Sequence, residues 1–233
     1  RGYGNSDKPT TDQNHSPYSK RSMAGDMREV MRKLGHKTFA VAGHDRGGRV
    51  AHRMARDYPD TITHLALLDI VPTLTMYEKT DKKFASSYYH WFFLIQPSPF
   101  PETLIEHNPE FFLKHKTNHW GRTAGAITDE AFAEYLRCFS DSATIHASCE
   151  DYRASASIDL EHDQDDFPKK LEMPVLVIWG DAGFVGQNYN VICEWKAVAT
   201  DVQGHSVPGG HFLAEEAPSE TAEALINFFS RVH

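Results

Sequence analysis

Cysteine is scarce in this chain, which has Cys138, Cys149 and Cys193 among its 233 residues. Their odd number and wide spacing argue against a disulfide framework, and no CxxC pair is present to hold zinc. Such a use of cysteine is typical of a reducing compartment. We therefore expect a cytoplasmic location and no structural metal.

Excess basic charge and long apolar runs are also lacking. The formal net charge is −8, from 24 Lys and Arg against 32 Asp and Glu, so the chain has no general attraction for phosphate. No stretch of about 18 apolar residues occurs, as a membrane-spanning helix would require. We expect neither nucleic acid nor a membrane as a partner, and arginines gathered in one pocket become informative.

The chain alternates short apolar runs with amphipathic stretches, which is the pattern of a parallel sheet covered by helices. The expected strands are 37–45, 62–71, 173–181 and 198–203, and the expected helices around them are 18–34, 47–57, 188–196 and 218–231. Residues 37–45 are apolar enough for a strand buried on both faces. Residues 73–168 predict several amphipathic helices that form a lid, and the acidic run 159–167 predicts a solvated linker.

Residues 39–48, FAVAGHDRGG, contain the most informative turn. Gly43 and Gly47 lie two positions before and after Asp45. A sharp strand-to-helix turn crowds both flanking positions and presents its central side chain as a nucleophile. The helix N-terminus that follows would stabilise an ionised carboxylate. The alternative is that Asp45 only caps the helix, but the glycines favour the nucleophile.

A carboxylate nucleophile implies a particular reaction. It displaces a leaving group from an sp3 carbon, or opens a strained ether, and activated water must then cleave the resulting ester. His211 follows a glycine pair between the last expected strand and helix, where α/β-hydrolases carry their base. Its acidic partner is either Asp69 or Asp181, since both end an apolar strand and the residues alone do not decide.

Six motifs stand in the same order as in the haloacetate dehalogenases of the α/β-hydrolase type: RGYGNSDKP, GHDRGGRVAHRMA, LLDI, HW, EDYRA and GHFLAEEAP. The chain resembles these enzymes over essentially its whole length, and the fluoroacetate dehalogenases most of all. The resemblance implies an α/β-hydrolase fold, a mostly parallel sheet flanked by helices, with core segments 1–71 and 169–233 and a helical cap at 72–168. Because the sequence opens in a loop at Arg1, we expect the family's N-terminal strands and HG-type loop to be absent from it.

The sharpest motif is HDRGGR, since haloalkane dehalogenases and epoxide hydrolases usually carry tryptophan at the position of Arg46. The resemblance also selects Asp69 over Asp181 as the acid. The implied site residues are Asp45 as nucleophile, His211 as base, Asp69 as acid, Arg46 and Arg49 for the substrate carboxylate, and His90, Trp91 and Tyr152 for the departing halide. Two guanidinium groups on one helical turn can grip a carboxylate, and a histidine, an indole and a phenol can donate to a halide.

The function implied by the resemblance is hydrolysis of a haloacetate to glycolate and halide through an aspartyl ester, with no metal or organic cofactor. A small anionic haloacid is the expected substrate, and a homodimer is the implied assembly. Two rivals stay open: an epoxide hydrolase with Tyr88, Tyr89 or Tyr135 aimed at the epoxide oxygen, and a non-catalytic ligand-binding protein of the same fold. Ser206 lacks the GxSxG pattern, and His115 with His119 on one expected helix lack a third zinc ligand.

Overall fold

A four-stranded parallel sheet forms the centre of the fold in the computed structural model, which describes residues 1–230. The strands lie in the order β1 (Phe39–His44), β2 (Ile62–Leu68), β3 (Val175–Gly180) and β4 (Val202–Val207). Parallel neighbours need crossover connections. Helix α2 (Asp45–Asp57) connects β1 to β2, and a long helical segment connects β2 to β3.

The predicted strands overlap all four observed strands. The differences concern the two edge strands, β1 and β4. Strand β4 begins at Val202 and not at 198, because residues before it form an isolated bridge between Ala199 and Leu171. The expectation that residues 37–45 are buried on both faces is wrong. Strand β1 pairs with β2 alone in the described part of the chain, and none of its residues is fully buried.

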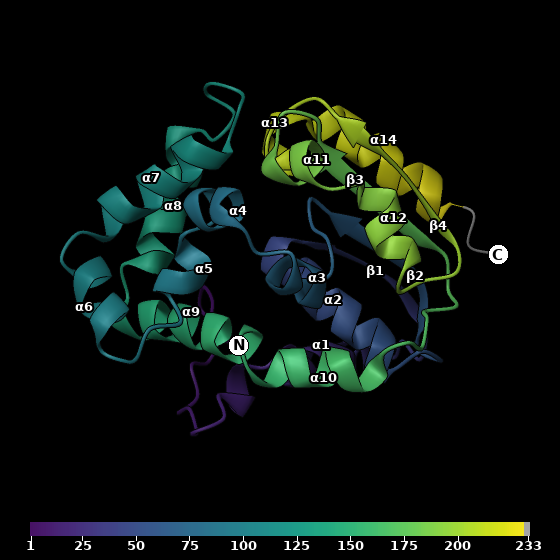
Figure 1. The fold of residues 1–233 in the computed structure, drawn as a ribbon, viewed down its shortest axis with the longest axis horizontal. Coiled ribbons are helices and arrows are strands. Elements are labelled where there is room, and N and C mark those ends of the chain that lie inside the picture. Colours follow the sequence, from purple (N-terminus) through teal and green to yellow (C-terminus); the bar gives the residue numbers. More distant parts are fainter. Residues whose placement is uncertain (231–233) are drawn as a thin grey trace.

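Alternate side chains of β2 point to opposite faces of the sheet, as the two-residue period of a strand requires. Leu65 and Leu67 belong to one apolar cluster with Met54 of α2, whereas Leu68 belongs to another with Phe228 of α14 (Pro218–Phe229). Figure 1 shows α2 and α14 on opposite sides of the sheet. Helices on both faces therefore hold the sheet and fix the ends of its strands.

The segment between β2 and β3 is helical, and the other helices apart from α2 lie before β1 or after β3. The remaining helices of the chain are η1 (Ser16–Tyr18), α1 (Lys20–Lys33), α3 (Thr73–Glu78), α4 (Lys82–Ser87), α5 (His90–Phe93), α6 (Phe100–Glu106), α7 (Pro109–Trp120), α8 (Asp129–Phe139), α9 (Ser142–Ser155), α10 (Ile158–Asp166), α11 (Phe184–Asn188), α12 (Val191–Lys196) and α13 (Leu213–Glu216). Helices α4 to α9 lie beside the sheet, whereas α10 returns along α3 (Figure 1). The division into core and cap stays a prediction.

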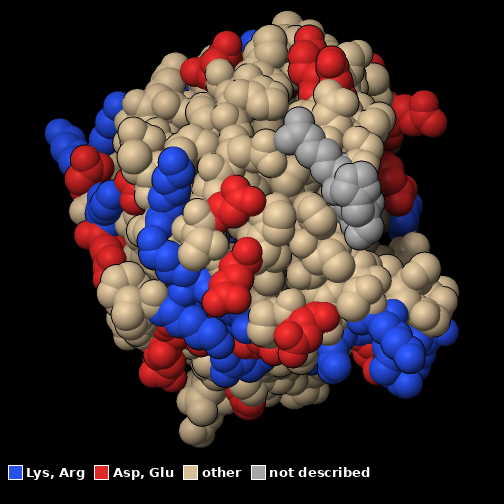
Figure 2. Space-filling model, turned by 90° about the vertical axis from the view of Figure 1, so that its right-hand side faces the viewer, with Lys and Arg blue, Asp and Glu red and all other residues tan. Residues whose placement is uncertain are grey.

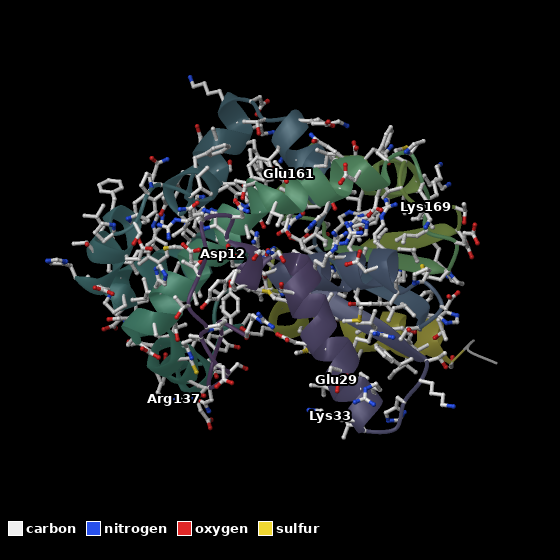
Figure 3. All side chains as sticks on the ribbon, turned by 90° about the horizontal axis from the view of Figure 1, so that it is seen from below. Asp12, Glu29, Lys33, Arg137, Glu161 and Lys169 are labelled. Atoms are coloured by element: carbon white, nitrogen blue, oxygen red, sulfur yellow. The ribbon has the colours of Figure 1, made fainter. Side chains whose placement is uncertain are left out.

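The acidic run 159–167, which its composition predicts to be a solvated linker, is mostly helical, with some residues exposed and others paired with basic groups. Helix α10 covers most of it, and its carboxylates meet basic groups of other helices. Asp159 lies 3.2 Å from the ammonium nitrogen of Lys20, and Asp163 lies 3.6 Å from a guanidinium nitrogen of Arg53. Glu161 of the same helix is exposed (Figure 3). The acidic composition alone does not predict this helix, because the basic residues that pair with its carboxylates lie far earlier in the chain.

The face drawn in Figure 2 carries charges of both signs, with Lys and Arg side chains beside Asp and Glu side chains and uncharged surface between them. Among residues 1–230, no helix combines the length and apolar character needed to cross a membrane.

Candidate active site

The connection from β1 to α2 is a sharp turn with Asp45 at its centre. The backbone of Asp45 has φ +46°, a left-handed conformation that costs a non-glycine residue free energy. Because His44 occupies the N-cap position of α2, Asp45 does not serve as the cap. Its carboxylate lies at the helix N-terminus, where the first backbone N–H groups have no acceptor within the helix. The turn thus presents Asp45 and stabilises its charge.

The glycines around Asp45 differ in how closely they are packed. A Cβ atom at Gly43 would lie 2.5 Å from the carbonyl oxygen of Gly47, and one at Gly48 would lie 2.8 Å from Cδ1 of Ile70. A Cβ atom at Gly47 would meet no described atom within 4 Å. The predicted crowding is therefore found at Gly43, but on the other side of Asp45 it is found at Gly48 and not at Gly47.

We expect Gly43→Ala to destabilise the protein by about 1–3 kcal/mol or more, because its Cβ collides with backbone that cannot move away. Gly47→Ala is the matched control and should change the free energy of unfolding by less than about 0.5 kcal/mol. Urea unfolding of both variants measures the difference. Equal stabilities would show that the turn is not closely packed.

His211 lies between β4 and α13 and faces Asp69. Its Nδ1 is 2.7 Å from Oδ2 of Asp69, and the other oxygen of that buried carboxylate accepts the backbone N–H of Gly180 at 3.1 Å. Asp69 itself has φ +50°, so a second strained residue aims this carboxylate. The bond at Nδ1 fixes the imidazole so that Nε2 faces Asp45, at 3.8 Å from Oδ2.

The two acids that the residues alone leave open have different partners in the structure. Asp69 contacts the imidazole of His211, whereas Oδ1 of Asp181 accepts the backbone N–H of Gly209 at 3.2 Å. Asp181 therefore supports the loop that leads to His211 and does not orient its ring.

The charges of Asp45 and His211 stabilise each other. Burial opposes a charge on His211, but the facing carboxylates of Asp45 and Asp69 outweigh it and raise the pKa of His211 to about 10. Burial likewise opposes the charge of Asp45, but the imidazole opposite lowers the pKa of Asp45 far below its usual value. The two groups therefore form an imidazolium–carboxylate pair at neutral pH.

This pair makes stability depend on pH in a defined direction. The pKa of His211 lies higher in the folded protein, so its contribution is full below the unfolded value of about 6.5 and is lost as pH rises through about 10. We expect the free energy of unfolding to fall between about pH 7 and 10, and to fall less in His211→Gln. Urea titrations across this range measure both slopes. Parallel slopes would contradict the raised pKa.

Arg49 lies one turn into α2 and is 4% exposed. One of its nitrogens donates to the carbonyl oxygen of Val71 (3.1 Å) and the hydroxyl of Thr73 (2.9 Å), and its guanidinium lies over the ring of Trp91. Its Nε has no partner, and no carboxylate pairs with it, among the residues that the structure describes. Burial, and then the charge of Arg46, lower the pKa of Arg49. A buried cation without a counterion is suited to an anionic ligand.

Arg46 is held in a different way. Its Nε and Nη2 donate to the two carboxylate oxygens of Asp151 at 2.9 and 2.7 Å, and Nη2 also donates to the hydroxyl of Ser155 at 2.6 Å. Its guanidinium lies 4.0 Å from the ring centroid of Tyr152. Within residues 1–230 its buried Nη1 has no partner. Of the two arginines predicted to bind a carboxylate, Arg46 therefore already has an acidic partner, whereas Arg49 has none among the described residues.

The three residues predicted to hold a halide form one buried cluster. The ring of Tyr152 lies 5.5 Å from that of His90 and 6.2 Å from that of Trp91, between centroids. Burial, reinforced by the charge of Lys116, lowers the pKa of His90 well below its usual value and keeps the imidazole neutral. Because Trp91 and Tyr152 also lie against the two guanidinium groups, the predicted halide cluster adjoins the two arginines predicted to bind a carboxylate.

Trp120, at the end of α7, belongs to the site although the sequence gives no clear signal for it. Its ring centroid lies 4.5 Å from that of His90 and 5.7 Å from that of His211. Its carbonyl oxygen also accepts the backbone N–H of His211 at 3.1 Å. Trp120 thus joins the predicted halide cluster to the predicted base.

Glu216 is a second residue that sequence reasoning misses. Its carboxylate accepts backbone N–H groups of Gly210 and Phe212, the two neighbours of His211, at 2.9 Å each. It also accepts those of Arg122 and Thr123, at 2.6 and 2.9 Å. Glu216 therefore ties the histidine loop to the segment that follows α7.

The three tyrosines considered for an epoxide hydrolase differ in their burial and in their distance from the candidate site. The ring of Tyr88 is buried and lies 5.4 Å from that of His90. Tyr89 and Tyr135 are exposed, and the hydroxyl of Tyr135 donates to Glu215. The ring of Tyr89 lies 6.2 Å from that of His90, so Tyr88 and Tyr89 both lie near the candidate site, and of these two Tyr88 is the buried one.

Two other motifs stay apart from this site. His115 and His119 stack on α7 with ring centroids 5.7 Å apart, and Ser206 lies on β4. In the part of the chain that the structure describes, no group of three or more His, Cys, Asp or Glu side chains could hold a metal ion.

The chain is similar to several known proteins over nearly its whole length. The α/β hydrolase fold family matches residues 1–218. A fluoroacetate dehalogenase of Burkholderia sp is 43% identical over 99% of this chain and 76% of its own, and a soluble epoxide hydrolase of Corynebacterium sp. (strain C12) is 32% identical over 99% and 78%. Among solved structures, a Nostoc sp PCC 7120 protein described as an α/β hydrolase is 55% identical with a TM-score of 0.98, over 99% of this chain and 79% of its own.

Proposed function

Since the chain belongs to the α/β-hydrolase fold family, we propose that it hydrolyses the carbon–halide bond of a haloacetate. Fluoroacetate or chloroacetate and water would give glycolate, halide and a proton. The observation that supports this substrate class is the pair of guanidinium groups beside Asp45, of which Arg49 has no carboxylate partner among residues 1–230. A neutral substrate would leave that buried charge without a counterion.

In the first step the carboxylate of Asp45 attacks the α-carbon. A carbon–oxygen bond forms, the carbon–halogen bond breaks, and its electron pair leaves with the halide. Arg49 and the free Nη1 of Arg46 would hold the substrate carboxylate and align the α-carbon with Asp45. The halide cluster of His90, Trp91 and Tyr152 would donate hydrogen bonds to the leaving group.

In the second step water cleaves the ester. Esterification neutralises Asp45, which removes one of the two carboxylates that raise the pKa of His211, so the imidazole loses its proton and becomes a base. His211 then takes a proton from water as the water oxygen attacks the ester carbonyl, and Asp69 stabilises the imidazolium. The backbone N–H of Arg46 would stabilise the oxyanion. As the oxyanion collapses, the carbon–oxygen bond to glycolate breaks and the imidazolium of His211 gives its proton to the leaving alkoxide. The regenerated Asp45 carboxyl then passes the remaining proton of the water to His211, which restores the imidazolium–carboxylate pair.

An epoxide hydrolase is the second candidate, supported by the Corynebacterium relative and by the position of Tyr88. To separate the two, we would incubate the protein with fluoroacetate, chloroacetate and an uncharged terminal epoxide. Halide with equimolar glycolate is the result that the proposal predicts. Diol from the epoxide without halide from either acid would favour the alternative. No product in any arm would favour a non-catalytic protein.

The proposal also includes the cap at residues 72–168 between core segments 1–71 and 169–233, a homodimer, and a cytoplasmic location. The first two come from the resemblance to haloacetate dehalogenases, and the location comes from the use of cysteine. Light scattering coupled to size exclusion measures the assembly, and a monomer at micromolar concentration would contradict the dimer.

A further inference from the structure

Asp151, on α9, is a fully buried carboxylate on which four donor groups converge. Arg46 donates to both of its oxygens, the hydroxyl of Tyr3 donates to Oδ2, and the ammonium group of Lys20 donates to Oδ1. These donors come from the N-terminal loop, α1 and α2. Burial opposes the charge of Asp151, but Arg46 and Lys20 outweigh it and lower its pKa. The carboxylate is therefore ionised at neutral pH.

The contacts of Asp151 leave Arg46 little rotational freedom. The Nε and Nη2 groups of Arg46 form two parallel bonds with the carboxylate, a geometry that fixes the guanidinium plane. Ser155 accepts a further bond from Nη2, and the ring of Tyr152 lies under the guanidinium face. Of the three guanidinium nitrogens, Nη1 is the one left without a partner in the described residues.

We propose that Asp151 is a positioning residue that fixes Arg46 so that its Nη1 binds the substrate carboxylate. This inference rests on the proposed function. The two arginines then have different roles: Asp151 pairs with Arg46, which contributes orientation, whereas Arg49, which has no carboxylate within ion-pair distance among residues 1–230, contributes positive charge.

The N-terminal segment bonds to the turn of α9 that carries Asp151. Besides Tyr3, which bonds to Asp151, residues Thr11 and His15 bond to the carboxylate of Glu150, the neighbouring residue of α9. Figure 3 labels Asp12 on this segment. Since Glu150 and Asp151 are both buried, the segment anchors the turn of α9 that carries Asp151.

Binding of acetate tests the proposal, because acetate carries the substrate's carboxylate and needs no catalysis. In Asp151→Asn the amide cannot accept from both nitrogens of Arg46, so we expect the Kd of acetate, measured by calorimetry, to rise about tenfold or more. In turnover, the same variant should raise the KM of a haloacetate more than it lowers kcat. A wild-type protein that binds acetate but releases no halide would overturn the proposed function and leave this inference standing.

Asp159→Asn is the matched control. It removes one negative charge from the same cluster, since Asp159 lies 3.2 Å from Nζ of Lys20. Asp159 makes no direct contact with Arg46 and reaches it only through a 3.5 Å bond from the hydroxyl of Ser155. We expect its Kd for acetate to stay within about twofold of the wild-type value. If Asp151 acted only through its charge, Asp151→Asn would strengthen acetate binding. An unchanged or lower Kd in Asp151→Asn would therefore overturn the proposal.

Ser155→Ala provides a second test if Asp151→Asn does not fold. It removes one acceptor of Arg46 Nη2 and leaves every charge in place. We expect a smaller rise in the Kd of acetate, about threefold to tenfold, with a thermal midpoint close to that of the wild type. A folded Ser155→Ala protein with the wild-type Kd would count against a role for the orientation of Arg46.

Discussion

In His211→Asn incubated with fluoroacetate, we expect a covalent adduct to accumulate on Asp45. The first step needs only the carboxylate and the anion-binding groups, whereas the second needs a base, so the ester forms and persists. Intact mass spectrometry should show a gain of about 58 Da, the mass of a glycolyl ester. Steady-state halide release should fall by about 10²–10⁴-fold, the usual contribution of a general base.

The double variant Asp45→Ala with His211→Asn is the control for this trapping experiment. It should keep its unmodified mass, because no carboxylate stands at the turn. Peptide mapping of the single variant should place the adduct within the β1–α2 turn. A single variant that keeps an unmodified mass, or that carries the adduct on another residue, would remove Asp45 as the nucleophile.

Arg49→Met should lower kcat/KM for a haloacetate by about 10–150-fold, since a hydrogen bond to a charged group contributes about 1.5–3 kcal/mol. Methionine keeps much of the side-chain volume and removes a buried charge that has no carboxylate partner in residues 1–230. Relieving that charge favours the fold and offsets the loss of the hydrogen bonds to Val71 and Thr73. We therefore expect lost activity together with a thermal midpoint equal to or above that of the wild type. Steady-state kinetics and thermal unfolding measure the two effects.

Arg32→Met is the control for this substitution. Arg32 lies on the exposed side of α1, where it pairs with Glu29, so its replacement should change neither activity nor the thermal midpoint appreciably. Figure 3 shows Glu29 on the same helix. A strongly destabilised Arg49→Met protein would indicate that Arg49 holds the fold and does not serve an anionic ligand.

The parts of the structure that the sequence predicts are those governed by local patterns. The turn at Asp45 depends on closely spaced glycines and an apolar run, and both are visible in a dozen residues. His211 could be placed because a glycine pair precedes it and a helix follows it. The choice of Asp69 needed the resemblance, because the direction of a side chain at a strand end is set by backbone conformation, here φ +50°.

The parts that the sequence does not predict depend on distant partners. The composition of helix α10 predicts a solvated acidic stretch, because Lys20 and Arg53, which contact its carboxylates, lie on helices far earlier in the chain. Asp151 stands in EDYRA beside the predicted Tyr152, yet nothing local shows that Arg46 and Tyr3 converge on it. Such contacts follow from how the helices pack, which residue spacing alone does not reveal.

The most direct test of the central claim is a single turnover in water enriched in oxygen-18, with protein in excess over fluoroacetate. If Asp45 attacks the α-carbon, the hydroxyl oxygen of glycolate comes from its carboxylate, so the first glycolate is unlabelled and the label enters Asp45. Mass spectrometry of the glycolate and of the peptide that contains Asp45 measures both. Labelled glycolate from a single turnover, with no label in Asp45, would show that water attacks the carbon directly and would contradict the account.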